Sequence, residues 1–356
     1  MFHPLKKDST GREEVFSMKS KNEFKSKLAI YMETYIHLRA ATGIDVSHLI
    51  YTYKELDEHL VSLNHDRDYI NKNDYDGWYE KMSMNAGIAT IYRKVSTIRQ
   101  LLTFMSQQGQ ECYMPRLPKK YKSPFVPYIY TREEMWLMFN ACDELRAQAR
   151  HPKSSLMAIP TIVRLLYSTA IRISEALNIK MKDINFERHV IVLNKTKNGS
   201  QRLAPINRSL ETVIRQYLEY RDRIGLSNLA SPESYLFVST LGNQCKRDTI
   251  YHWFEIVREK AGIPYKGNHE GPRIHDIRHT ACAHSLVKML ASGTDIYCYL
   301  PMLSMFMGHK NIYDTETYLR LTREYYPDLM KMDASVISGI TKVLSRSLII
   351  KTNGNI

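Results

Sequence analysis

Cysteine is scarce in this chain, and its apolar residues never form a long uninterrupted run. The five Cys among 356 residues (positions 112, 142, 245, 282 and 298) are odd in number and contain no CxxC pair. We therefore expect no disulfide framework and a reducing compartment, the cytoplasm. No segment approaches the roughly 20 consecutive apolar residues that a membrane-spanning helix requires, and residues 1–22 lack the apolar region of a signal peptide. These absences argue against secretion and against a membrane partner.

Acidic residues are in deficit as well. The chain has 50 Lys and Arg against 37 Asp and Glu, a formal net charge of +13. Such a balance favours a polyanionic partner such as nucleic acid, although an ordinary basic cytoplasmic protein is the alternative. Residues 86–130 contain only one acid, Glu111. Six cations of this stretch are candidate contacts to DNA phosphates: Arg93, Lys94, Arg99, Lys119, Lys120 and Lys122.

The first part of the chain has the pattern of a helical domain. After a charged leader (1–21), apolar residues recur at intervals of three and four from Phe24 to Leu38, and Gly43 ends this helix. Further helices are expected over 53–63, 74–84 and 88–108, the last with Thr90 as its N-cap. Four Pro in residues 115–127 exclude a continuing helix. We therefore predict a helical domain over 22–114 and a basic linker over 115–130.

The second part, 131–356, is expected to be helical with a small sheet. Thr131 and Glu134 form a capping-box pattern that opens it. Two helices are expected within 156–179, and others over 210–223 and 248–262. Strands over 189–193 and 201–206 flank an Asn-Gly turn, which is typical of a hairpin.

Six side chains of this second part have the chemistry needed to break a phosphodiester without a metal or cofactor. A Tyr hydroxyl can attack phosphorus, and Arg forks can hold the non-bridging oxygens on which charge grows. His side chains can move protons or hold the phosphate, and a Lys can protonate the leaving 5′ oxygen. The candidates are Arg172, Lys197, His275, Arg278, His309 and Tyr318.

The order and spacing of these segments, from about Thr131 to Thr322, resemble the tyrosine recombinase (phage integrase) family. The resemblance rests on the box around Arg172, the His-Asp-Ile-Arg-His run at 275–279, Gly308-His309, and a Tyr nine residues after that His. It implies a core-binding domain and a catalytic domain that close around duplex DNA as a C-shaped clamp. It further implies cleavage at short inverted sites through a 3′-phosphotyrosyl link to Tyr318, without cofactor or metal. By the same resemblance the protein acts in the bacterial nucleoid as a homotetramer joined by its C-terminal tail, with accessory DNA-bending or element-encoded proteins.

Some assignments within this resemblance stay open. The spacing to Pro205 favours Lys197 as the catalytic Lys, whereas counting from the preceding strand favours Lys195. Glu175 is placed to brace Arg172, and we interpret His279 as a structural residue.

The chain also departs from the family pattern at single positions. Ala170 stands where the family usually has Gly, and Met307 where it has Leu. The i, i+4 spacing of His275 and His279 is that of a zinc pair, but the Glu of an HExxH motif is missing. An apolar stripe over 336–348 predicts a tail helix that packs either on its own domain or on a neighbouring protomer.

Two other functions use much of the same chemistry. A type IB topoisomerase would share the nucleophile and relax DNA without a defined site, and an accessory protein would bind DNA without cleaving it. The complete set of six side chains favours a recombinase. The stretch 301–309 and the long interval before it suggest an integrase or transposase of a mobile element.

Overall fold

The computed structural model describes residues 24–119, 126–148, 155–194, 201–267, 270–292, 296–309, 311 and 315. Contacts divide the chain into two units, Met1–Pro124 and Phe125–Ile356. The division lies within the Pro-rich stretch expected to be a linker. Lys120, Lys122, both candidate Lys of the hairpin, Tyr318 and the tail lie outside the described residues.

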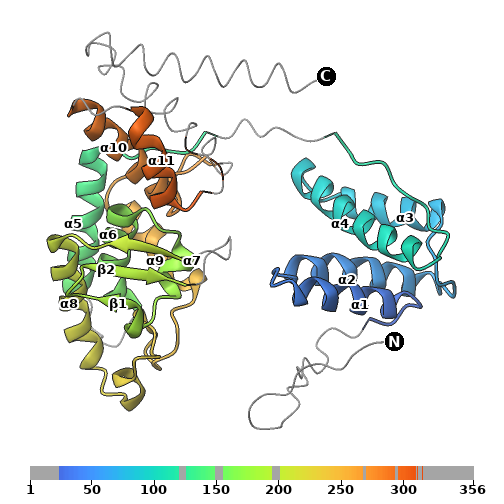
Figure 1. The fold of residues 1–356 in the computed structure, drawn as a ribbon, viewed down its shortest axis with the longest axis horizontal. Helices are drawn as coiled ribbons and strands as arrows, with labels where there is room; N and C mark the ends of the chain where they lie inside the picture. The colour runs from blue at the N-terminus through green and yellow to red at the C-terminus, as the bar shows by residue number, and fades with distance from the viewer. Residues whose placement is uncertain are drawn as a thin grey trace. The chain divides into compact units, whose positions relative to one another are not determined.

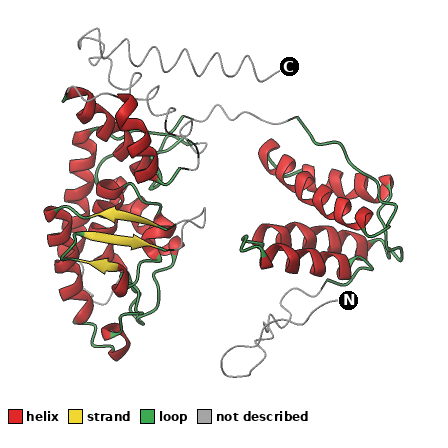
Figure 2. Ribbon diagram, viewed as in Figure 1, coloured by secondary structure: helices red, strands yellow, loops and turns green. Residues whose placement is uncertain are grey.

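The described part of the first unit is made of helices (Figures 1 and 2). They are α1 (Ala29–Ala41), α2 (Ser47–Ser62), α3 (Lys72–Ser83) and α4 (Ile88–Gln107). Helix α4 packs on α1 and α2. The two predictions of 53–63 and 74–84 find the right helices, although α2 begins six residues before the expected start.

The predicted apolar face of α1 is confirmed except at its last position. Phe24 and Leu28 are buried, and Tyr31 and Tyr35 pack partly buried against the same cluster. Leu38 is 51% exposed, because Met32 and Ile36 are the buried residues of the helix itself. Helix α4 begins at Ile88 as predicted, but its N-cap is Gly87 rather than Thr90.

The second unit combines helices with a small sheet. Its elements are α5 (Arg132–Gln148), α6 (Ile159–Thr169), α7 (Ile173–Leu177), β1 (Ile184–Asn185), β2 (Val190–Leu193), β3 (Arg202–Pro205), α8 (Arg208–Asp222), α9 (Arg247–Lys260), α10 (Asp276–Ala291) and α11 (Ile296–Met307). The predicted capping box of α5 is confirmed. The Glu134 amide donates to Thr131 Oγ1 (3.0 Å), and the Thr131 amide donates to Glu134 Oε2 (2.7 Å).

The described strands form an antiparallel sheet in the order β1-β2-β3. The pairs Val190↔Pro205 and Leu193↔Arg202 define the register of β2 and β3. The predicted hairpin is therefore confirmed, and residues 194–201 connect its strands.

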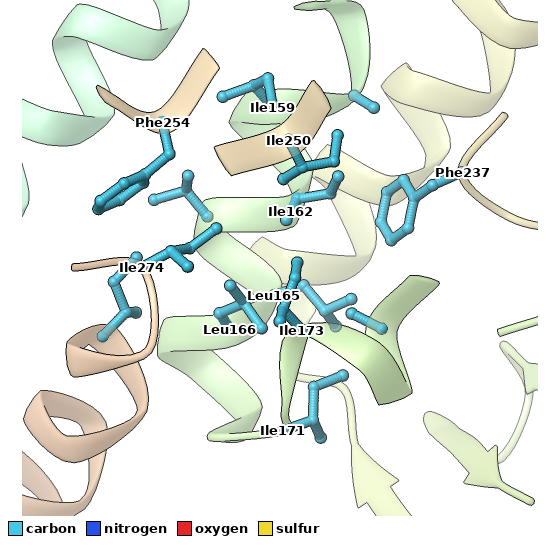
Figure 3. Close-up of a cluster of buried hydrophobic side chains, with 14 of the residues drawn as sticks. Ile159, Ile162, Leu165, Leu166, Ile171, Ile173, Phe237, Ile250, Phe254 and Ile274 are labelled. Carbon is cyan, nitrogen blue, oxygen red and sulfur yellow. The ribbon is translucent and has the colours of Figure 1, made fainter. Parts of the chain in front are cut away.

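Helix α6 is the centre of the second unit, and it contacts α5, α8, α9 and α10. Ile159, Ile162, Leu165 and Leu166 on this helix meet Ile250 and Phe254 of α9 and a set of other buried side chains (Figure 3). Contacts on most of its sides explain why eight residues of α6 are buried, whereas Arg164, Tyr167 and Ser168 reach the surface. The turn that follows α6 carries Arg172 and is fixed by this core.

A second apolar cluster joins the last two described helices. Cys282, Ala283 and Leu286 of α10 pack with Leu300 and Leu303 of α11. This packing sets the ends of α10 and α11 relative to each other. Within the described residues, no helix has both the length and the apolar character to cross a membrane.

Candidate active site

Arg172 lies at the N-cap of α7, directly after a tight turn. Ala170 caps the C-terminus of α6 with φ of +51°, in the left-handed region that favours Gly. A residue with a Cβ in this conformation is destabilised by on the order of 1 kcal/mol relative to Gly, which explains why the tyrosine recombinase family usually has Gly at this position. The turn directs the chain into α7, and the Arg172 side chain remains 19% exposed.

The carboxylate of Glu175 joins two Arg side chains. Arg172 Nη1 donates to Glu175 Oε1 (2.8 Å), and the Arg172 amide donates to Oε2 (2.9 Å). Arg202 of β3 donates to the same two oxygens, from Nη1 (3.0 Å) and Nη2 (2.7 Å). The expected ion pair between Arg172 and Glu175 is thus present, and a third member that we did not predict completes it.

The charge of Glu175 depends on these partners. The residue is 2% exposed, and burial alone would raise the pKa of its carboxyl. Hydrogen bonds from Arg202 and Arg172 outweigh burial and lower that pKa to about 2. Glu175 is therefore an anion over the whole working pH range, with two cations bound to it.

Arg278 is 3% exposed and connects three segments. It lies in the first turn of α10, and its Nη1 donates to the carbonyl oxygen of Ala170. Its Nη2 donates to the carbonyl oxygen of Met307 at the end of α11 (2.6 Å). Because Ala170 is two residues before Arg172, the bond from Arg278 to Ala170 brings the two predicted Arg-containing motifs together.

His275 lies in the turn immediately before α10, and the Arg278 amide donates to its carbonyl oxygen (3.1 Å). Its ring makes an edge contact with the ring of His279, with the centroids 5.0 Å apart. Burial, and then the positive charge of Arg278, lower the pKa of His275. Burial and His275 lower the pKa of His279 to about 3. Both imidazoles are therefore neutral at pH 7.

We predict that both rings titrate with midpoints below pH 6.5 in the DNA-free protein. The two pKa values lie below the ordinary 6.5, so the unfolded chain binds these protons more readily. Their contribution to stability is complete above about pH 6.5 and is lost as the pH falls. NMR titration of ¹³C-labelled His, assigned with His275→Asn and His279→Asn variants, measures this. A midpoint above 6.5 for either ring would contradict the assignment.

His309 follows α11 after Gly308 and is oriented by a hydroxyl. Its Nδ1 lies 2.8 Å from Oγ1 of the buried Thr315. The charge of His309 also contributes to the low pKa of His279, so the two rings belong to one neighbourhood. Thr315 was not predicted. Its only sequence signal is its position between His309 and Tyr318.

The β2-β3 hairpin reaches the same neighbourhood through Arg202, the first residue of β3 after the turn, which pairs with Leu193. Lys195 and Lys197 lie in its connection, outside the described residues. A period of two along β3 places Arg202 in phase with the buried Ala204, and this is the signal that could have identified it. A charged residue on the inner face of a strand indicates a buried ion pair.

Among the six cations predicted to contact DNA phosphates, Lys94 needs a correction. Its side chain is 10% exposed, and its Nζ lies 2.5 Å from Glu55 Oε2. Lys94 therefore stabilises the contact between α4 and α2 and is not an open surface cation. Arg99 donates to the Pro115 carbonyl oxygen (2.6 Å), whereas Arg93 and Lys119 are exposed.

Residues 130–324 match the profile described as the Phage integrase family. The chain is 32% identical over 218 residues to the integrase/recombinase y4rB of Sinorhizobium fredii, across 61% of this chain and 66% of that relative. It is 30% identical over 241 residues to the tyrosine recombinase XerC of Staphylococcus epidermidis, across 66% of this chain and 72% of the relative. The match thus spans just under two thirds of the first relative and more of the second.

Solved structures show the same fold. The XerH site-specific recombinase bound to its difH substrate, a pre-cleavage complex, matches with a TM-score of 0.62 and 15% identity, across 84% of this chain and 95% of that one. The Tn1549 transposon integrase in complex with a circular intermediate DNA matches with a TM-score of 0.54 and 17% identity, across 81% and 94%. The expected fold class, mainly α with a small sheet, is confirmed.

Proposed function

This chain belongs to the phage integrase family of site-specific tyrosine recombinases, and we propose that six of its side chains cut and rejoin DNA: Arg172, Lys197, His275, Arg278, His309 and Tyr318. The observation that carries the proposal is the bond from Arg278 to Ala170. Together with the bond from Arg278 to Met307, it places Arg278 close to the turn that carries Arg172 and to the end of α11 that precedes His309. A phosphate between such groups meets two guanidinium forks and two imidazoles.

In the proposed reaction, the Tyr318 oxygen attacks the scissile phosphorus and the bond from phosphorus to the 5′ oxygen breaks. A phenol has an ordinary pKa of about 10 and must lose its proton during attack. His275, neutral at pH 7 because burial lowers its pKa, is suited to accept that proton. Lys197 gives a proton to the leaving 5′ oxygen. Arg172, Arg278 and His309 hold the non-bridging oxygens, on which negative charge increases.

The second half of the reaction reverses the first on another strand. A 5′ hydroxyl of the partner DNA attacks the phosphotyrosine, and Tyr318 leaves. The number of phosphodiesters is unchanged, so no external energy source is needed. The proposed substrate is duplex DNA with short inverted sites, and the relatives solved in complex with DNA support this choice.

The test is a covalent-trapping experiment with the full chain. The duplex is first selected from a random-sequence pool by binding to the wild-type protein, and then nicked beside the cleavage site so that the 5′-hydroxyl fragment diffuses away. We expect a protein–DNA adduct on this duplex, in the presence of excess EDTA, because Arg and His handle the charge. No adduct would support an accessory protein. Adducts on any duplex, with relaxation of supercoils, would support a topoisomerase.

We predict that Lys197→Ala cleaves poorly on ordinary DNA and is largely rescued when sulfur replaces the bridging 5′ oxygen. A thiolate leaves without a proton, so the general acid becomes unnecessary. Single-turnover rates on the two substrates measure the rescue. Lys195→Ala is the matched control, and rescue of that variant instead would move the acid to Lys195.

We propose that the tail beyond Tyr318 joins protomers in a homotetramer on synapsed DNA. Deletion of residues 335–356 is then expected to leave binding to a single site nearly unchanged and to reduce synapsis and strand exchange. Gel-shift assays of single and paired sites measure both. If the truncated protein unfolds, the tail packs on its own domain. If it recombines normally, the tail has no role between protomers.

The finer function that we propose is that of an integrase or transposase of a mobile element, working on DNA in the bacterial nucleoid. The integrase/recombinase y4rB and the Tn1549 transposon integrase support this choice among relatives that also include the tyrosine recombinase XerC. Sequencing the DNA around the gene tests it. Element ends that match the duplex selected by the protein are the expected result.

A further inference from the structure

The side chain of Arg202 makes hydrogen bonds to two segments that are distant in sequence, unlike an exposed residue of a hairpin. Both terminal nitrogens of its guanidinium donate to Glu175, and its Nε donates to the carbonyl oxygen of Phe306 in the last turn of α11 (3.2 Å). Its side chain is 11% exposed. One side chain thus connects β3, the carboxylate beside Arg172, and the helix end that precedes His309.

The absence of a side chain at Gly308 leaves space for the guanidinium of Arg202. A Cβ added at Gly308 would lie 2.9 Å from Arg202 Nη1 and 3.0 Å from its Cζ. The backbone there also has φ of +66°, which disfavours any other residue. The guanidinium therefore lies directly against the backbone that leads into His309.

The two Arg side chains share Glu175 unequally. Among the described residues, Arg202 makes two side-chain bonds to the carboxylate and Arg172 makes one, from Nη1. A bidentate pair uses both terminal nitrogens of a guanidinium. Because Arg202 occupies this role, Arg172 is left with donors for another ligand.

We propose that Arg202 is a positioning residue: it takes the bidentate place on Glu175 so that Arg172 can bind the scissile phosphate, and it holds the end of α11 that carries His309. This inference rests on the proposed phosphate-binding role of Arg172. Without Arg202, Glu175 is a buried anion with Arg172 as its remaining side-chain partner. The carboxylate then draws the Arg172 fork into a closed pair, and the phosphate loses a donor.

The test measures single-turnover adduct formation on the nicked duplex for the wild type, Arg202→Gln, Arg202→Lys, Glu175→Gln and the double variant Glu175→Gln/Arg202→Gln. Arg202→Gln is expected to be slower by about 10- to 100-fold, as is typical of a misplaced catalytic group. Arg202→Lys retains a charge but not the fork, so an intermediate loss is expected. Arg215→Gln, which removes an exposed Arg–Glu pair on α8, is the matched control and should cleave normally.

The double variant separates positioning from an independent role. In Arg202→Gln, the Glu175 carboxylate draws Arg172 away from the phosphate, and the double variant removes that carboxylate. We therefore expect the double variant to cleave no more slowly than Arg202→Gln alone. Losses that multiply would show that Arg202 acts independently of Glu175, and would overturn the proposal.

Two further readouts make the result specific. Bridging sulfur should not rescue Arg202→Gln, because its defect is in phosphate binding; rescue to the level of Lys197→Ala would mean that Arg202 acts through the hairpin instead. Thermal melting and binding to the intact duplex should be close to wild type for Arg202→Lys. If both Arg202 variants unfold or fail to bind DNA, the residue is structural and the proposal is wrong. If the wild type itself forms no adduct, the proposed function has failed instead.

Discussion

Tyr318→Phe is expected to form no covalent adduct on the nicked duplex and to bind the same duplex with unchanged affinity. The substitution removes only the attacking oxygen, and the ring that remains can occupy the same space. Transfer to phosphorus has no second route through a phenyl ring, so the loss is complete rather than partial. Adducts are measured on denaturing gels, and binding is measured by gel shift on the intact duplex.

Neighbouring tyrosines make this experiment informative. Tyr313, Tyr325 and Tyr326 lie close to Tyr318 in a chain with 24 Tyr. Tyr313→Phe is the matched control, since it removes a hydroxyl five positions away. If Tyr318→Phe still forms adducts, and Tyr313→Phe does not, the nucleophile is Tyr313 and the spacing from His309 has misled us.

Arg172→Ala and Arg278→Ala are each expected to slow cleavage by about 10²-fold or more, the usual effect of removing a donor to the transition state. The two variants should differ in stability. Arg172 is partly exposed, and Glu175 keeps Arg202 as a partner when Arg172 is lost. Arg278 is buried and bonds two carbonyl oxygens, so its loss leaves both without their donor. We therefore expect a lower melting temperature for Arg278→Ala only.

Arg278→Lys provides the control for that difference. It retains a positive charge but cannot bond both carbonyl oxygens and a phosphate in fixed geometry. If it folds like the wild type and still cleaves slowly, the defect belongs to phosphate binding. Near-normal single-turnover cleavage by Arg172→Ala or by Arg278→Ala would contradict the proposed clamp.

Local patterns in the sequence were sufficient for the elements that position the site. The capping box of Thr131 and Glu134, the hairpin around the Asn-Gly turn and the α9 region followed from short-range rules, and all three are present. Short-range rules failed in detail at Leu38, which is exposed at the end of the predicted apolar face of α1, and at the N-cap of α4, which is Gly87 rather than Thr90. A helical period marks one face only approximately, and more than one residue type can serve as an N-cap.

Charge was the least predictable property. Lys94 was predicted as one of six cations that contact DNA phosphates, yet it is buried against Glu55, 39 residues away in sequence. Arg202 was given no role from the sequence, yet it bonds Glu175 and the carbonyl oxygen of Phe306 at the end of α11. Composition gives the number of charged residues but not which of them form ion pairs. Packing determines which residues distant in sequence come close enough to pair.

By itself, the sequence determined the family and the mainly helical fold, and it supplied the side chains that we propose for the chemistry, because each rests on residue type and on spacing along the chain. Tertiary structure alone decided that Arg202 shares Glu175 with Arg172 over a separation of 27 residues, and reaches the Phe306 carbonyl over 104. It also decided why residue 308 is Gly, since only the folded chain brings the Arg202 guanidinium against that backbone. The physical reason is the range of the interactions: caps, turns and periodicity act within a few residues, whereas ion pairs and steric fit depend on which distant segments the core brings together.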